Sequence, residues 1–254
     1  MSGLALSAHV PVVLVPGLSG APTEDFAFLA PMLARHRRVL PVDLTALTNA
    51  DSESTDSLID PAAAETVIAA TAEEAGEPVA LVGVSVGAVL AMRVAARRPE
   101  LVSQLVLVAG WLAPPVKLTA FADTWARLRR EQSGALNAVS AAALTSIDGF
   151  ERARGLPGTP ATDRLVALAA RLGAAGAESV RAPTLVIAAD HDELAGPAES
   201  RLLFVTIPDA RLATVPTGHA ALVERPAEVL RLVGDFLERP HRHPATTRIP
   251  AMRP

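Results

Sequence analysis

The feature that most constrains the fold is a serine between two glycines, placed directly after a short apolar run. The segment Gly83-Val84-Ser85-Val86-Gly87 follows Val79–Val82 and precedes Ala88–Arg98, which is rich in helix-forming residues. Glycine at both flanking positions permits a backbone too tight for a Cβ atom. The pattern predicts a strand that ends on a sharp turn and continues as a helix, with the serine hydroxyl exposed at the strand end.

The residues that follow extend this unit into a parallel sheet. The predicted helix is apolar on most sides, which is typical of a buried helix, and Pro99 marks its end. Leu105–Val108 is a further β-branched run. A strand, a helix and a second strand form a βαβ unit, and such units belong to parallel sheets.

Strand and helix patterns alternate over most of the chain. One helix is predicted from Asp60-Pro61 to Gly76, and another, with an apolar stripe, begins at Pro226 and reaches Leu237. This alternation predicts an α/β fold with a doubly wound, mostly parallel sheet. The predicted strands are Val10–Val15, Arg38–Val42, Val79–Val82, Leu105–Val108, Thr184–Ala188 and Arg211–Val215.

The alternation stops between residues 111 and 177, where no strand pattern occurs. Helices are predicted there at Leu118–Glu131, Ala135–Ser146 and Asp163–Leu172. We interpret 111–177 as a helical lid over the carboxyl end of the sheet; the alternative is helices packed on its flank. Residues 1–110 and 178–239 then form the α/β core, and 240–254, which lacks periodicity, is predicted to be a mobile tail.

Composition excludes several functional classes. The chain has 254 residues, half of them apolar, which suffices for one large core with an insertion. Its net charge of −4, without a basic stripe, gives no indication of a nucleic-acid partner, and the lack of cysteine excludes thiol nucleophiles and disulfides. Without a basic signal segment or a membrane-length apolar run, we expect a cytoplasmic protein that acts on a small molecule without membrane, cofactor or metal. The oligomeric state stays open.

A serine nucleophile needs a general base, and His219 is the best placed of the six histidines. It follows the strand Arg211–Val215 and a short turn, so it is expected at the same sheet edge as Ser85. The alternative is a solvated loop imidazole. The orienting acid is expected in the loop after Thr184–Ala188, where spacing does not distinguish Asp190 from Asp192.

Acyl transfer also needs two donors for the oxyanion of the tetrahedral intermediate. We assign one to the backbone N–H of Val86, and the other to Leu18 in the loop Pro16–Gly20, hereafter the oxyanion loop. Gly17 and Gly20 allow this loop to bend towards Ser85. The alternative is an ordinary turn at a strand end. A dinucleotide site is poorly supported because the loop lacks the G-x-G-x-x-G pattern.

Together these segments resemble the α/β-hydrolase superfamily, from Val10 to Leu237. The serine–acid–histidine order of the chain is that of this architecture, and the insertion is similar to those of enol-lactonase-like members and small-molecule esterases. The matching pieces are Val13–Leu18, Val42–Leu44, Leu81–Gly87, Ala182–Ile187 and Gly218–Pro226.

The resemblance adds expectations that spacing alone does not supply. The family pattern places the acid three residues after the position of Ala189, which implies Asp192 over Asp190. The other family position for an acid reads Ala109-Gly110-Trp111 here, without a carboxylate, and this strengthens Asp192. A serine nucleophile argues against epoxide hydrolases and haloalkane dehalogenases, which are built on aspartate. Pro16 and Val84 stand where the family often has histidine; these departures leave backbone donors in place and the substrate class open.

The sequence therefore predicts a serine hydrolase that cleaves a small carboxylic ester, lactone or thioester through an acyl-enzyme. An apolar acyl or lactone group is expected to bind against Trp111, Phe121, Trp125 and Phe150, unless these aromatics only form the core of the insertion. Two alternatives remain. One is another reaction of the same triad, such as C–C bond hydrolysis, perhydrolysis, acyl transfer or cyclisation, and the other is a non-catalytic ligand receptor.

Overall fold

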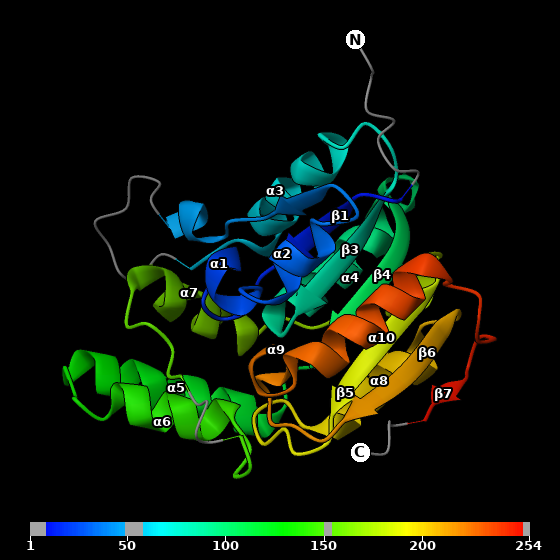
Figure 1. Cartoon of the computed structure of the whole chain (residues 1–254). Coiled ribbons are helices and arrows are strands. Elements are labelled where there is room, and N and C mark those ends of the chain that lie inside the picture. Colours follow the sequence, from blue (N-terminus) through cyan, green and yellow to red (C-terminus); the bar gives the residue numbers. More distant parts are fainter. Residues whose placement is uncertain (1–8, 49–57, 150–153, 251–254) are drawn as a thin grey trace.

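A parallel sheet forms the centre of the molecule (Figure 1). The computed structural model describes residues 9–48, 58–149 and 154–250, and within them seven strands are ordered β2-β1-β3-β4-β5-β6-β7, each pair parallel. The carboxyl ends of all these strands therefore lie at one edge. The strands are β1 Val12–Val15, β2 Val39–Pro41, β3 Val79–Val84, β4 Val102–Val108, β5 Thr184–Ala189, β6 Ala210–Val215 and β7 Arg248–Ile249.

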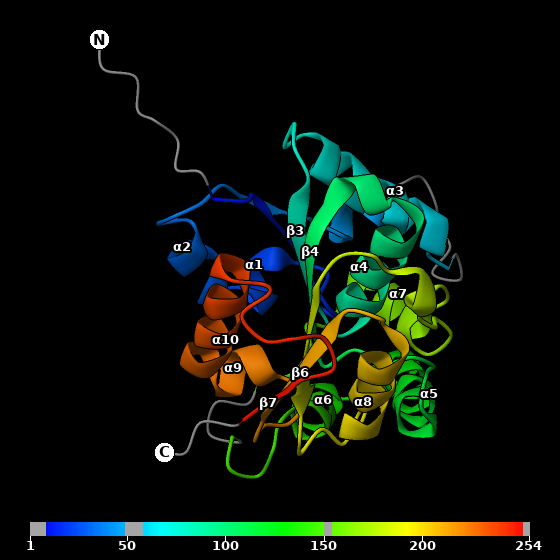
Figure 2. The ribbon, with the colours of Figure 1, turned by 90° about the vertical axis from the view of Figure 1, so that its right-hand side faces the viewer.

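Helices cover both faces of the sheet (Figure 2). Val13 and Val15 of β1 belong to the hydrophobic cluster shared with α3, α4 and α8, whereas Val12 and Leu14 belong to the cluster shared with α2, α9 and α10. This alternation along a fully buried strand confirms the predicted doubly wound α/β fold. The helices of the two faces are α1 Pro22–Asp25, α2 Leu29–Leu33, α3 Pro61–Glu73, α4 Val86–Arg97, α8 Pro197–Thr206, α9 Ala221–Glu224 and α10 Pro226–Glu238.

The insertion between β4 and β5 consists of α5 Val116–Arg130, α6 Leu136–Leu144 and α7 Pro160–Ala169. Helix α5 packs against α6 and α7, and α7 also contacts α4 of the core. Two indole groups fasten this segment: Trp111 Nε1 donates to the Leu172 carbonyl at 2.8 Å, and Trp125 Nε1 donates to Asp163 at 2.8 Å. Three short 3₁₀ turns complete the described structure: η1 Thr45–Thr48, η2 Pro99–Leu101 and η4 Ala177–Ser179.

The segment after α10 differs from the predicted mobile tail. In its described part, residues 240–250, strand β7 pairs with β6 through Leu212–Arg248 and Ala213–Ile249. The Thr246 N–H donates to the Ala210 carbonyl at 2.7 Å. A strand of two residues is too short to produce an alternating pattern in the sequence, so periodicity does not reveal it.

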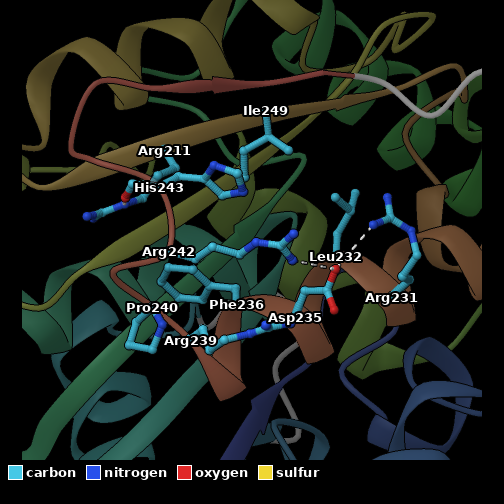
Figure 3. A pocket seen from close by; sticks show the side chains of 10 residues that line it. All are labelled: Arg211, Arg231, Leu232, Asp235, Phe236, Arg239, Pro240, Arg242, His243 and Ile249. Atoms are coloured by element: carbon cyan, nitrogen blue, oxygen red, sulfur yellow. Dashed lines mark hydrogen bonds and ion pairs between the residues drawn. The ribbon is translucent and has the colours of Figure 1, made fainter.

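Arginines hold this segment against the sheet and α10 around a cavity of about 190 Å³ (Figure 3). Arg211 Nε donates to the His243 carbonyl at 2.8 Å. Arg231 and Arg242, both partly exposed, reach the Asp235 carboxylate at 3.3 and 3.9 Å. Arg211 and Arg242 fasten the terminal segment, whereas Arg231 pairs with Asp235 within α10, and none of the predicted site residues lies there. In the described ranges no helix combines the length and the apolar character needed to cross a membrane.

Candidate active site

The turn that carries Ser85 joins β3 directly to α4. Ser85 has φ 57° and ψ −127°, a conformation that residues with a side chain rarely adopt. A Cβ on Gly83 would lie 2.4 Å from the Gly87 carbonyl oxygen, and one on Gly87 would lie 2.2 Å from the Pro16 carbonyl oxygen. Close backbone approach therefore requires both glycines, and the strained turn presents the serine hydroxyl at the sheet edge.

The structure brings Ser85, His219 and Asp192 together from the ends of β3, β6 and β5. His219 Nε2 lies 2.7 Å from Ser85 Oγ, and His219 Nδ1 lies 2.8 Å from Asp192 Oδ2. The side chains come from positions far apart in the chain, yet each is almost completely buried: Ser85 is 4%, His219 3% and Asp192 4% exposed. The arrangement is a continuous hydrogen-bond chain from a hydroxyl through an imidazole to a carboxylate.

The second oxygen of Asp192 is held by the backbone. Asp192 Oδ1 accepts the N–H groups of Leu194 at 2.8 Å and Ala195 at 2.9 Å. Burial opposes ionisation of this carboxyl, but the His219 charge and hydrogen bond together with the two N–H groups outweigh it, so the pKa of Asp192 lies below its ordinary value. Asp190, in contrast, is exposed and pairs with Arg201 at 3.1 Å. Of the two aspartates, the structure places Asp192 against His219.

The oxyanion loop lies against Ser85. A Cβ on Gly17 would lie only 3.0 Å from the Ser85 Cβ atom, and Gly20, at φ 74°, reverses the loop. Within the described part of the chain, the N–H groups of Leu18 and Val86 have no hydrogen-bond partner. Both donors are therefore available to an incoming oxygen next to Ser85.

Sequence reasoning missed Asp25, which lies at the end of α1. Its Oδ2 atom accepts the Gly17 N–H at 2.6 Å and the Ser19 hydroxyl at 2.9 Å. Although the residue is partly exposed, its carboxyl group is enclosed by protein, and burial raises its pKa to about 6 despite these two donors. An acidic residue in a short helix after a strand-end loop was the only signal in the sequence.

Glu224 links the loop of residues 216–220, hereafter the histidine loop, to the helical insertion. One of its carboxylate oxygens accepts the Gly218 N–H at 2.9 Å and the Ser146 N–H at 3.1 Å, while the other accepts the Ser146 hydroxyl. The Ala220 N–H donates to the carbonyl of Leu144, the last residue of α6, at 2.8 Å. The residues on both sides of His219 are thus tied to the end of α6.

A cavity of about 540 Å³ opens next to the oxyanion loop and the histidine loop. Its polar lining includes Glu24, Asp25 and Arg154, the last contributed by the insertion. The apolar lining comes from Ala27, Phe28, Leu144, Leu156, Pro157, Ala220, Leu222, Val223 and Pro226.

In the residues that the structure describes, no three histidine, aspartate or glutamate side chains gather in a way that would hold a metal ion.

The aromatic residues proposed from sequence to bind substrate do not line this cavity. Trp111, Phe121 and Trp125 are 0%, 7% and 2% exposed and belong to the hydrophobic core, with both indole N–H groups bonded inside the protein. The interpretation of these three as core of the insertion fits their positions. Phe150 lies outside the described residues.

Comparisons with known proteins agree with this architecture. The profile of the "Alpha/beta hydrolase family" matches residues 12–232. A "Pyrrolizixenacetamide deacetylase" of Xenorhabdus hominickii is 27% identical over 241 residues, which cover 89% of this chain and 90% of the relative.

Two solved structures show the same fold. One is MGS-M2, an alpha/beta hydrolase enzyme from a Medee basin deep-sea metagenome library, with a TM-score of 0.77 and 18% identity over 94% of this chain and 92% of that one. The other is the enol-lactonase from Burkholderia xenovorans LB400, with a TM-score of 0.71 and 20% identity over 94% and 95%. The family match spans most of the chain, and we conclude that this protein is an enzyme of the α/β-hydrolase family.

Proposed function

We propose that the protein is a serine hydrolase that cleaves a small carboxylic ester, lactone or thioester through an acyl-enzyme. Ser85 Oγ attacks the carbonyl carbon and transfers its proton to His219 Nε2. Asp192 holds the imidazole and offsets the positive charge that forms on it, while the N–H groups of Leu18 and Val86 bind the oxyanion. His219 then returns the proton to the leaving oxygen or sulfur, and a water molecule activated by His219 releases the acid.

The observation that carries this proposal is the pair of contacts at His219, 2.7 Å to Ser85 and 2.8 Å to Asp192. A receptor has no need for a strained serine that is hydrogen-bonded to a buried histidine–aspartate pair. The cavity volume suits a small substrate. Its charged lining consists of two carboxylates, Glu24 and Asp25, and one guanidinium, Arg154, and this negative balance favours a neutral acyl group over an anionic one.

Labelling with a fluorophosphonate probe, read by intact mass, tests the nucleophile. We expect the wild type to gain one adduct, whereas Ser85→Ala and His219→Ala gain none because the hydroxyl or its base is missing. Ser103→Ala is the matched control: Ser103 lies near the start of β4, at the opposite sheet edge, and its hydroxyl donates to the backbone carbonyls of Pro78 and Val79. This control should label like the wild type.

Turnover of p-nitrophenyl esters, lactones and thioesters completes the test. On any substrate that the wild type hydrolyses, Ser85→Ala should lower kcat by at least about 10⁴-fold with an unchanged circular dichroism spectrum. Wild-type turnover by Ser85→Ala, or a folded wild type that never labels, would overturn the proposal and favour a receptor.

A second candidate is amide hydrolysis, specifically removal of an acetyl group from an amine. It is favoured by the 27% identity to a protein named as an acetamide deacetylase, over nearly the full length of both chains. The chemistry is the same attack on a carbonyl, with a nitrogen leaving group that His219 must protonate. A pair of matched substrates, phenyl acetate and acetanilide, separates the two candidates by the ratio of their kcat/KM values.

A further inference from the structure

The backbone of the oxyanion loop is held by a side chain outside the triad. Asp25 Oδ2 accepts two hydrogen bonds from the loop, one from the Gly17 N–H at 2.6 Å and one from the Ser19 hydroxyl at 2.9 Å. These donors flank Leu18, whose own N–H points to no partner within the described residues. The carboxylate thus holds the peptide N–H before the proposed oxyanion donor and the side chain of the residue after it.

The same loop contacts the nucleophile, so its position matters for the reaction. The site of a Cβ on Gly17 lies 3.0 Å from the Ser85 Cβ atom and 3.5 Å from Asp25 Oδ2. Gly17 is therefore enclosed between the serine and the aspartate. A shift of this loop by a fraction of an ångström changes the distance from the Leu18 N–H to any oxygen that forms at the Ser85 adduct.

The charges around Asp25 come from α1, from the loops after β5 and β6, and from the insertion. Glu24, its neighbour in α1, opposes its ionisation, and His219, from the loop after β6, favours it. Asp192 lies behind His219, and Arg154 lines the same cavity as Asp25. With burial as the largest effect, the pKa of Asp25 is raised to about 6. The carboxyl group is thus mainly ionised at pH 7, in the form that accepts both donors most strongly.

We propose that Asp25 is a positioning residue that anchors the oxyanion loop, so that the Leu18 N–H is aligned with the oxyanion before the substrate arrives; this role rests on the proposed serine-hydrolase function. Asp25 does not touch the reacting atoms. It acts through the Gly17 and Ser19 contacts, and its effect belongs to the transition state rather than to substrate binding.

The kinetic test compares Asp25→Ala, Asp25→Asn and Ser19→Ala on an ester that the wild type hydrolyses. Asp25→Ala should lower kcat about 10- to 100-fold with KM within about threefold, because the oxyanion interaction develops only in the transition state. Asp25→Asn keeps an acceptor oxygen and should recover much of the loss. Asp43→Asn, an exposed aspartate that caps its own turn at Thr45, is the matched control and should behave like the wild type.

The second readout does not depend on turnover. In protein labelled with ¹⁵N-glycine, the Gly17 amide signal should shift with pH with a midpoint near 6 and lose this dependence in Asp25→Asn. Because His219 favours ionisation of Asp25, His219→Ala should move the midpoint to higher pH.

The outcomes separate this proposal from the proposed function. Unchanged kcat in Asp25→Ala, a rise in KM alone, or a Gly17 amide that titrates identically in Asp25→Asn would overturn the anchor. If Asp25→Ala does not fold, Ser19→Ala, which removes one of the two bonds, must lower kcat at least about threefold. A wild type that fails to label with the fluorophosphonate while its Gly17 amide titrates with Asp25 would reject the proposed function and leave the anchor standing.

Discussion

The Asp25 carboxyl group is ionised at neutral pH in surroundings that disfavour its charge. Its pKa in the folded protein is about 6, above the ordinary 3.8, so the fold favours the protonated form. The resulting contribution to stability is complete below pH 3.8 and is lost as the pH rises through about 6. A functional carboxylate of this kind lowers the stability of the fold under the conditions in which it works.

Because the pKa of Asp25 is raised in the folded protein, the effect of Asp25→Asn on stability should depend on pH. At pH 8 we expect the free energy of unfolding of the variant to exceed that of the wild type by about 1–2 kcal/mol. This is less than the roughly 3 kcal/mol that the raised pKa of a fully buried carboxyl implies, because the residue is partly exposed. At pH 4.5 the difference should largely vanish. Urea unfolding at both pH values measures it, with Asp43→Asn as the control. An equal difference at the two pH values would argue against a raised pKa.

Residue positions in the candidate site were predictable where chemistry demands a particular side chain in a particular order. Ser85 and His219 follow from the elbow motif and from the position after a strand, and the structure joins them. Asp190 and Asp192 differ only in side-chain direction, because Asp192 turns inwards through its bonds to Leu194 and Ala195 while Asp190 faces Arg201. Asp25 escaped prediction because a carboxylate that accepts a backbone N–H from eight residues away and a hydroxyl from six residues away has no motif.

At the scale of elements, the β3–turn–α4 unit depends on the absence of a side chain at Gly87. Gly87→Ala would place a Cβ 2.2 Å from the Pro16 carbonyl oxygen and 2.4 Å from that of Val15, both fixed backbone atoms. We expect a loss of at least about 3 kcal/mol in the free energy of unfolding and a displaced oxyanion loop. Thermal melting measures the loss.

Gly234 provides the matched control for this substitution. It lies in α10, where a Cβ would meet nothing within 4 Å. Gly234→Ala should therefore raise stability by about 0.5–1 kcal/mol through helix propensity, with unchanged activity. If both variants melt alike, steric conflict at the elbow does not govern this unit.

The elements that periodicity missed are short or lack a clear apolar stripe. Helix α8 begins at Pro197, after its N-cap Gly196, and buries only Ser200, Leu203 and Phe204, which do not form a clear apolar stripe. Helices α1 and α2 have four and five residues, too few for a helical repeat. The long strands and α10 were predictable because burial on one or both faces dictates their residues over many positions.

For the whole molecule, the terminal segment protects an edge of the sheet. Strand β7 has two residues, carries Arg248 and is followed by Pro250, features that discourage pairing with another chain. Deletion of residues 245–254 exposes the backbone of β6. We expect aggregation that increases with protein concentration and a lower melting temperature, with unchanged activity per folded molecule since the triad lies elsewhere.

Light scattering over a concentration series measures this effect. Deletion of residues 251–254 alone, which leaves the pairing of Leu212 with Arg248 intact, is the control and should match the wild type. A longer truncation that stays as well dispersed as this control would show that β6 needs no cover.

Because of the contacts of Glu224 and Ala220, we expect activity and the folded sheet to be lost at two different temperatures. His219, the proposed proton carrier, lies between residues that are bonded to the end of α6, whereas Ser85, the proposed nucleophile, lies on the central sheet. Warming that loosens the insertion would therefore move His219 away from Ser85 while the sheet is still folded. We therefore expect activity to be lost at a lower temperature than that at which the sheet unfolds, and to return on cooling without refolding of the sheet.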